Sequence, residues 1–164
     1  MKNYLSDICI YTRTYSGDAE LIPYLYQSIA KFIPQAGDFV LVVEQRDYEL
    51  IKKVTPSWVR IVQEETFAPG TIQHKYSKIT ADLHTDKKFI FHIDADSIFI
   101  KTPSEDELFC NGKPFLEYAP YETLYKYYDS QEFYDQMKKY ALENGPIFLE
   151  AATYRYHGYL IKKV

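Results

Sequence analysis

The sequence predicts an α/β protein with an open, largely parallel central sheet and helices on both faces. Short runs of β-branched and aromatic residues recur along the first hundred residues, which is typical of buried strands. Segments with apolar residues at helical spacing separate these runs, giving the order β-α-β-α-β-α-β. The chain has 164 residues, 46% of them hydrophobic and 26% charged, as is ordinary for a soluble globular protein. We therefore expect one domain over residues 1–164.

Four strands and three helices are predicted in the first hundred residues. The strands lie at residues 7–12, 39–43, 58–62 and 89–93, and the helices at residues 19–32, 47–54 and 72–83. The first helix carries Leu21, Leu25 and Ile29 at helical spacing, and Asp18 is its expected N-cap. Pro34 ends this helix, because its ring removes a backbone donor and clashes with the preceding turn.

The rest of the chain predicts a smaller, mixed β/α portion. Short strands are expected at residues 97–101, 114–118, 147–149 and 154–161. Residues 122–143 carry tyrosines and apolar residues at helical spacing, and the run Asn144-Gly145-Pro146 stops that helix. The sequence contains no internal repeat and no interdomain linker.

Charge and composition exclude several classes of function. A formal net charge of −4 argues against a protein that binds the phosphate backbone of nucleic acid, which needs a basic face. No apolar stretch approaches the roughly 20 residues of a membrane-spanning helix, and the N-terminus lacks the apolar core of a signal peptide. Cys9 and Cys110 are too few for a metal cluster and are expected to be reduced thiols. A cytoplasmic location is therefore expected.

Two aspartates stand directly after the fourth predicted strand, in the run Asp94-Ala95-Asp96. Carboxylates beside a buried strand cost free energy unless something pairs them, and a divalent cation would remove that cost. The first strand ends in Tyr11-Thr12-Arg13, and ligands of open parallel sheets bind beyond the carboxyl ends of the strands. The two segments are therefore expected to share one crevice. The alternative is structural: the two acids cap a turn and no metal binds.

These residues resemble the GT-A family of nucleotide-sugar-dependent glycosyltransferases. The resemblance rests on the strand that ends in Tyr11-Thr12-Arg13, on the Rossmann-like alternation, and on residues 91–99 around the Asp-x-Asp motif. The polar helix at residues 73–79 is similar to one that precedes the motif in several such enzymes. Within the family, the chain resembles the small GT-A domains of chlorovirus-type glycosyltransferases. The likeness covers residues 6–118.

The resemblance implies a GT-A fold in which two parts of the chain bind different substrates. Residues 1–100 would form the nucleotide-sugar-binding half, and residues 101–164 the acceptor-side portion. GT-A catalytic domains commonly run well beyond 164 residues. The chain is therefore either a compact member or a fragment whose acceptor-binding part is missing.

The resemblance also implies a bound Mn²⁺ or Mg²⁺ that bridges the two phosphates of the donor. Asp94 and Asp96 are its expected ligands: Asp96 is the firmer one, and Asp94 faces the ribose, the sugar or a metal-bound water. Oxygen ligands suit a hard octahedral cation. The cation would neutralise charge on the leaving nucleoside diphosphate as a Lewis acid.

Four further residues are implied in nucleotide-sugar binding. Tyr11, Thr12 and Arg13 would line the nucleotide, with Tyr11 stacking on the base or Thr12 bonding to it. Arg13 or Lys78 would contact the pyrophosphate, Arg through its forked guanidinium and Lys as a point charge. For each basic residue the alternative is an ordinary solvated surface charge.

The acceptor side is less defined by the sequence. An inverting transferase needs a carboxylate base near the acceptor hydroxyl, and the family places it after the Asp-x-Asp motif. Glu150 and Glu117 are the candidates, with Glu150 slightly favoured, and either can equally be a surface acid. His157 is a candidate third metal ligand, with a structural histidine as the alternative.

The expected function is a metal-dependent transfer of sugar from a nucleotide-diphosphate sugar, with a UDP-sugar favoured, to an acceptor that the sequence does not define. One alternative is a non-catalytic nucleotide-sugar-binding module. A less favoured alternative is a haloacid-dehalogenase-like phosphatase, which also uses an Asp-x-Asp motif. That family normally carries the motif near its N-terminus, with Thr or Val where this chain has Ile98.

Overall fold

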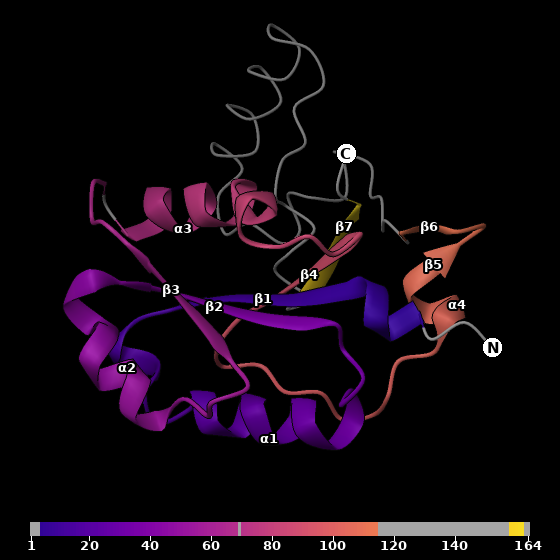
Figure 1. Ribbon diagram of the computed structural model, residues 1–164, viewed down its shortest axis with the longest axis horizontal. Helices are drawn as coiled ribbons and strands as arrows, with labels where there is room; N and C mark the ends of the chain where they lie inside the picture. Colours follow the sequence, from indigo (N-terminus) through magenta and orange to yellow (C-terminus); the bar gives the residue numbers. More distant parts are fainter. Residues whose placement is uncertain (1–3, 69, 115–157, 163–164) are drawn as a thin grey trace, which may run out of the picture. The chain divides into compact units, whose positions relative to one another are not determined.

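The computed structural model describes residues 4–68, 70–114 and 158–162 and contains a five-stranded sheet (Figure 1). The strands are β1 (Ile8–Thr14), β2 (Asp38–Glu44), β3 (Arg60–Glu64), β4 (Phe89–Ile93) and β7 (Gly158–Lys162), in the order β3-β2-β1-β4-β7. Strands β1 to β4 pair in parallel, and β7 pairs antiparallel with β4. The predicted class, an α/β fold with a mostly parallel sheet flanked by helices, is confirmed.

Helices cover both faces of this sheet. Helices α1 (Ile22–Phe32) and α2 (Tyr48–Val54) lie on one face, and α3 (Gly70–Ile79) lies on the other (Figure 1). Short 3-10 turns complete the connections: η1 (Tyr4–Asp7), η2 (Ser16–Asp18), η3 (Gln45–Asp47) and η4 (Ala81–His84). Parallel neighbours need crossovers of this kind, because a tight turn can join only antiparallel strands.

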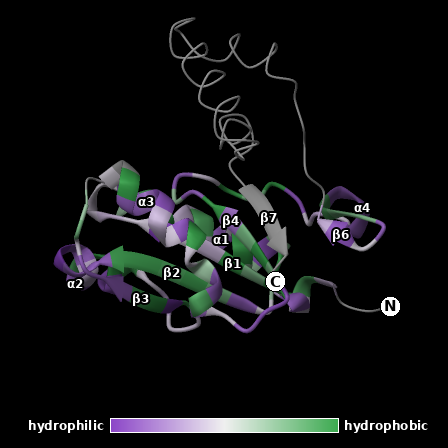
Figure 2. Ribbon diagram, turned by 90° about the horizontal axis from the view of Figure 1, so that it is seen from above, coloured by the Kyte–Doolittle hydropathy of each residue, from purple (hydrophilic) through white to green (hydrophobic). Residues whose placement is uncertain are grey.

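The sheet face covered by α1 and α2 holds the larger apolar core. Its buried members include Ile8 and Ile10 of β1, Leu41 and Val43 of β2, and Ile22, Leu25 and Ile29 of α1. Figure 2 shows the resulting hydrophobic colouring along β2. Each fully buried aliphatic side chain of this kind contributes about 2 kcal/mol through the area it removes from water.

The sheet face covered by α3 combines a smaller apolar cluster with buried polar groups. The cluster contains Cys9, Tyr11, Val40, Val42, Ala81 and Ile90. Gln73 and Ser77 of α3 are buried as well. The Gln73 amide donates to the Glu65 carbonyl at 2.6 Å and accepts from the Phe67 N–H at 3.2 Å. Hydrogen bonds therefore fix this helix and its preceding loop in addition to apolar contacts.

The first helix begins at Ile22 rather than Ala19, and Asp18 is not its N-cap. Leu21 is the N-cap residue, without a side-chain hydrogen bond, and Pro23 occupies the first turn, where its fixed φ and missing N–H suit a helix start. Asp18 belongs to η2 and accepts a hydrogen bond from Thr14 Oγ1 at 3.0 Å. This correction places Asp18 near the end of β1.

Other predicted elements differ in detail. The third strand starts at Arg60 rather than Trp58, and the helix predicted at residues 72–83 divides into α3 and η4. The strand predicted at residues 97–101 is wrong, since no strand forms there. Ile98 and Ile100 are exposed, whereas Phe99 between them packs against the core. The segment therefore runs as a loop.

A short helix and a small hairpin follow this loop. Helix α4 (Glu105–Leu108) was not predicted, although a capping box formed by Ser104 and Glu107 starts it. Strands β5 (Phe109–Cys110) and β6 (Lys113–Pro114) pair across Asn111-Gly112, whose φ angles of 52° and 71° suit a tight hairpin turn. Pro114 of the strand predicted at residues 114–118 belongs to β6, and residues 115–118 lie outside the described residues.

Several predictions fall on residues that the structure does not describe. Strand β7 covers residues 158–161 of the strand predicted at 154–161. The helix predicted at 122–143 and the strand predicted at 147–149 lie outside the described residues. All described residues belong to one compact unit, residues 1–115 with 157–164. Within the described part of the chain, no helix has the length and apolar character needed to cross a membrane.

Candidate functional site

The sheet order creates a topological switch point between β1 and β4. From β1 the chain proceeds to β2 and β3 on one side, and β4 then lies on the other side of β1. Tyr11 of β1 pairs with His92 of β4, so the carboxyl ends of the two strands are neighbours. Ligands of open α/β sheets bind in the crevice at such a point. The segments Tyr11-Thr12-Arg13 and Asp94-Ala95-Asp96 therefore lie at one edge of the sheet, as the sequence predicts.

Asp94 interacts with side chains of α3. Its Oδ1 lies 3.3 Å from Lys78 Nζ and 3.8 Å from His74 Nε2. His74 and Lys78 are four residues apart and so share one face of the helix. The Lys78 side chain is 12% exposed and that of Asp94 is 36% exposed, so this ion pair is only partly open to solvent. Lys78 thus contacts a carboxylate at the site.

Asp96 has different surroundings, although only Ala95 separates it from Asp94. The Ser97 N–H donates to the Asp94 carbonyl at 3.1 Å and closes a turn. Within this turn Ala95 is buried against the larger apolar core, and Asp96 is exposed. One acid of the motif is therefore paired with a lysine, and the other faces solvent.

Asp18, the predicted N-cap of the first helix, is a third carboxylate near this edge, where Thr14 at the end of β1 donates to it. Its pKa is raised, first by burial and then by the negative charges of Asp96 and Asp94, while hydrogen bonds to Thr14 and Tyr15 oppose the shift. The charges of Asp94 and Asp96 therefore act on Asp18. The signal available in the sequence was an acid placed within a few residues of the end of the first strand.

Arg13 is held by a buried carboxylate. Its guanidinium lies 2.6 Å from Glu44 Oε1, and the two side chains are 8% and 3% exposed. Thr66 Oγ1 and Arg46 Nε contact the second Glu44 oxygen at 2.6 Å and 3.0 Å. The hydrogen bond from Thr66, followed by that from Arg13, holds the pKa of Glu44 below its usual value against the opposing effect of burial. Glu44 was not predicted, because its buried partner Arg13 and its partner Thr66 come from distant parts of the chain.

Tyr11 and Thr12 are buried, each with 1% of its surface exposed. The Tyr11 hydroxyl donates to the Ser77 carbonyl at 2.9 Å, and the ring packs edge-on against His92 with 5.2 Å between centroids. Among the described residues, Thr12 Oγ1 has no hydrogen-bond partner. Tyr15, one residue beyond β1, is 50% exposed. The aromatic ring accessible at the end of β1 is therefore that of Tyr15 rather than that of Tyr11.

Two histidines lie close to Asp94 and Lys78, namely His92 of β4 and His74 of α3. Burial is the main cause that lowers the pKa of His92 to about 3, and the neighbouring charge of Lys78 adds to the shift. The same two causes lower the pKa of His74 to about 4, although the Asp94 carboxylate opposes them. Both imidazoles are therefore neutral at pH 7. Of the α3 side chains that approach Asp94, Lys78 supplies the positive charge.

The donor chemistry of this edge fits a hard divalent cation. Asp18, Asp94 and Asp96 present carboxylate oxygens, which Mg²⁺ and Mn²⁺ prefer to nitrogen or sulfur. Asp96 is exposed to solvent, so water can complete the coordination. No group of three or more His, Cys, Asp or Glu side chains in the described residues is already arranged around a metal position.

The remaining predicted site residues are not described. Glu117, Glu150 and His157 lie within residues 115–157, outside the described part of the chain. Their predicted roles as catalytic base and third metal ligand stay predictions.

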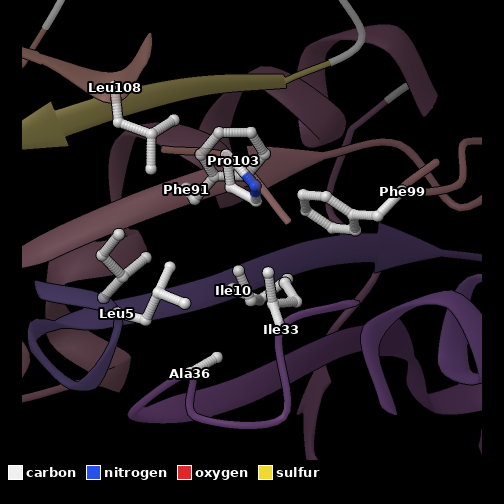
Figure 3. A pocket seen from close by; sticks show the side chains of 9 residues that line it. Leu5, Ile10, Ile33, Ala36, Phe91, Phe99, Pro103 and Leu108 are labelled. Carbon is white, nitrogen blue, oxygen red and sulfur yellow. The ribbon is translucent and has the colours of Figure 1, made fainter. Parts of the chain in front are cut away.

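A small cavity lies away from the site, beneath β1 and β4. Figure 3 shows its lining, which includes Ile10, Ile33, Phe91 and Phe99. Its volume is about 10 Å³, roughly the room for one water molecule, and a water would need polar partners. The described residues that line the cavity are all apolar, so we interpret it as a packing gap.

Comparison with solved structures gives distant matches that cover part of the chain. One is a mannosyltransferase from Pyrobaculum calidifontis in complex with GDP-Man and Mn²⁺, with 19% identity, a TM-score of 0.44, and coverage of 57% of this chain and 28% of the other. Another is TarS of S. aureus, with 20% identity, a TM-score of 0.41, and coverage of 56% and 28%. A third is 4-diphosphocytidyl-2C-methyl-D-erythritol synthase from Anaerococcus prevotii, with 13% identity, a TM-score of 0.41, and coverage of 54% and 42%.

The chain thus spans less than half the length of these solved structures. No curated protein gives a significant match. Residues 5–147 match the model of DUF6492, a family of unknown function, and the chain belongs to that family.

Proposed function

We propose that this protein is a glycosyltransferase that moves a sugar from a nucleotide-diphosphate sugar, with a UDP-sugar favoured, to an acceptor. The observation that carries the proposal is the meeting of Asp94 and Asp96 with the end of β1 at the switch point of a mostly parallel sheet. Asp18 adds a third acid at the same place. Such an edge offers oxygen ligands for a cation at the kind of position where open α/β sheets bind nucleotides.

Asp96 would hold a Mn²⁺ or Mg²⁺ ion, together with Asp94, Asp18 or water. When bound, the cation supplies Lewis-acid stabilisation of the charge on the departing nucleoside diphosphate. Lys78 of α3 adds a positive charge beside Asp94. Arg13 is engaged by Glu44, so its role in the proposal is to keep a buried positive charge near the site.

Tyr15 would provide the surface on which the nucleotide base stacks. Its ring is half exposed and follows β1 directly, whereas the Tyr11 ring is enclosed beneath α3. Base–aromatic stacking contributes about 1–3 kcal/mol for each base. The catalytic base and acceptor contacts would come from residues beyond the described part, with Glu150 or Glu117 as the base and His157 as a further metal ligand.

Thermal melting with a panel of donors tests this proposal. UDP-, GDP- and CMP-sugars are added with and without Mn²⁺, and a ligand that binds only the folded state raises the melting temperature. We expect one nucleotide class to raise it in the presence of Mn²⁺ and not in EDTA. No shift with any donor would contradict the proposal.

The donor that binds is then tested for transfer and hydrolysis. Release of free nucleoside diphosphate in the presence of one of a range of acceptors indicates that the protein is a glycosyltransferase. Metal-dependent binding without turnover indicates instead the non-catalytic nucleotide-sugar-binding module.

A further inference from the structure

Helix α3 carries its polar and apolar residues on the opposite sides from an ordinary surface helix. A helix that covers a sheet normally turns its apolar side inward and its polar side to solvent. The buried side of α3 instead holds Gln73 and Ser77, and Ala81 of η4 continues this side into the smaller apolar cluster. The apolar residues of α3 therefore lie on its outer side.

The outer side of α3 and η4 forms a row of exposed apolar side chains, which we call the α3 stripe. Its members are Ile72, Tyr76, Ile79 and Leu83, each with between 47% and 79% of its surface exposed. The Thr80 N–H donates to the Tyr76 carbonyl and the Leu83 N–H to the Thr80 carbonyl, both at 3.0 Å, so η4 continues directly from α3. Phe67, which is also exposed, packs edge-on against Tyr76 with 4.8 Å between ring centroids.

The size of this apolar surface suits a weak protein–protein contact. The exposed parts of the α3 stripe and Phe67 amount to roughly 600 Å², the upper end of the apolar patches that typical monomers expose. Two such surfaces in contact would bury roughly 1,200 Å² in total, the lower limit for specific interfaces. A complex of this size is expected to be reversible.

The spacing of the α3 stripe is the same from either end. Its four residues are separated by four, three and four positions. If two copies of the helix pack antiparallel about a two-fold axis, Ile72 lies opposite Leu83 of the second copy, and Tyr76 lies opposite Ile79. A two-fold contact requires such a self-complementary surface, because both copies present the same patch.

The charges beside the α3 stripe match the same arrangement. Lys75 and Asp82 are exposed and lie on one flank of the helix, because seven residues make about two turns. In the antiparallel pair Asp82 lies level with Gln73 of the second copy, about 3 Å along the axis from the level of Lys75. Opposite charges therefore meet twice across the axis. A parallel pair would instead place Lys75 beside Lys75 and Asp82 beside Asp82.

We propose that the α3 stripe is the surface through which two copies of this chain associate, with their α3 helices antiparallel about a two-fold axis. The dimer is weak, and the monomer prevails at low micromolar concentration. His74 and Lys78, which approach Asp94, are not part of the stripe. The dimer is therefore independent of the function proposed above.

Sedimentation velocity of the full chain from about 2 µM to about 500 µM tests this proposal. We expect the average sedimentation coefficient to rise from that of a monomer towards that of a dimer. Ile79→Gln removes an apolar contact twice in each dimer and should weaken association by at least about tenfold. Ile100→Gln is the matched control: Ile100 is 78% exposed against 79% for Ile79, lies in the loop after β4, and should change the affinity by less than about twofold.

An exchange of charges tests the antiparallel arrangement. Lys75→Glu alone or Asp82→Lys alone places like charges opposite each other and should weaken association by about threefold or more. The two substitutions together should restore the affinity to within about twofold of the unchanged protein. Melting temperatures at low micromolar concentration verify that each variant folds, and those of the monomers should agree.

Five results would overturn the proposal. A protein that stays monomeric at the highest concentration has no such dimer, and equal losses for Ile79→Gln and Ile100→Gln would place the contact elsewhere. Single charge changes that the double change does not rescue would exclude the antiparallel pair. A monomer that binds vesicles of phosphatidylcholine and phosphatidylserine, with binding lost in Ile79→Gln, would make the occupant a membrane. A lower melting temperature of the Ile79→Gln monomer would show that the stripe is covered within the chain itself.

Discussion

The two faces of the sheet use different chemistry to hold their helices. The face beneath α1 and α2 is closed by aliphatic side chains such as Leu25 and Ile29. The face beneath α3 contains a smaller apolar cluster, together with buried Gln73 and Ser77 and the Arg13–Glu44 ion pair. The first face contributes stability through apolar burial. The second face carries charged groups near the carboxyl ends of the strands, and its stability depends on the pairing of these groups. Charged groups of this kind are what a ligand-binding site needs.

The largest expected effect is on the α3 face, at Glu44. Glu44→Ala leaves the buried Arg13 guanidinium without its carboxylate and should lower the free energy of unfolding by about 3–5 kcal/mol. Arg46→Ala removes the exposed partner of the same carboxylate and should cost at most about 1 kcal/mol. Denaturant titration measures both. Equal losses of unfolding free energy for the two variants would mean that burial does not decide the strength of the ion pairs around Glu44.

On the opposite face, Leu25→Ala should cost about 2–5 kcal/mol, because it leaves a cavity in a close-packed core. Ile79→Ala removes an apolar side chain with the same number of carbon atoms from an exposed position of α3 and should change stability by no more than about 0.5 kcal/mol. Chemical denaturation compares the two variants. The contrast between the faces also predicts that Leu25→Ala keeps Mn²⁺ affinity, and a loss of metal binding at unchanged folding would contradict it.

The α3 face should also make stability depend on pH. His92 has a pKa of about 3 in the folded state against 6.5 for an ordinary histidine, so below pH 6.5 the unfolded state binds more protons. The free energy of unfolding should therefore fall as pH is lowered from 7 to about 4.5, above the range in which most carboxylates titrate. His92→Gln should reduce this dependence and leave the part that His74, whose pKa is about 4, contributes. Parallel curves for the two proteins would show that His92 is not held neutral.

A smaller effect separates the two tyrosines at the end of β1. Tyr15→Ala should weaken binding of the preferred nucleotide by roughly fivefold or more, since stacking on the base is lost. Tyr11→Phe removes one buried hydrogen bond to Ser77 and should lower stability by about 1 kcal/mol without changing nucleotide affinity. Calorimetric titration distinguishes them. The reverse order of affinities would assign stacking to Tyr11.

The sequence was sufficient for the order of the four parallel strands and for the meeting of Asp94 and Asp96 with the end of β1 at one edge of the sheet. Apolar runs such as residues 39–43 lie within a strand because they are buried on both faces. Segment 97–101 has a similar composition but failed as a strand, since two of its apolar residues face solvent. Local composition does not reveal which runs find a pairing partner in the sheet.

The contacts within the site could not be predicted in the same way. Lys78 and Asp94 are 16 residues apart, and Arg13 and Glu44 are 31 apart. Their pairing depends on how α3 and β2 are placed beside the ends of β4 and β1. Asp18 was misassigned because an acid before a helix is a common N-cap, and Pro23 moved the helix start away from it.

The most direct test of the proposed function is the effect of Asp96→Ala on metal-dependent donor binding. The affinity for the nucleotide-sugar that gives the largest melting shift is measured with Mn²⁺ and with EDTA, for the unchanged protein and for the variant. We expect the variant to fold, because Asp96 is exposed beyond β4, and to lose the Mn²⁺-dependent part of the affinity. An Asp96→Ala protein that binds the donor with undiminished Mn²⁺ dependence would contradict the account.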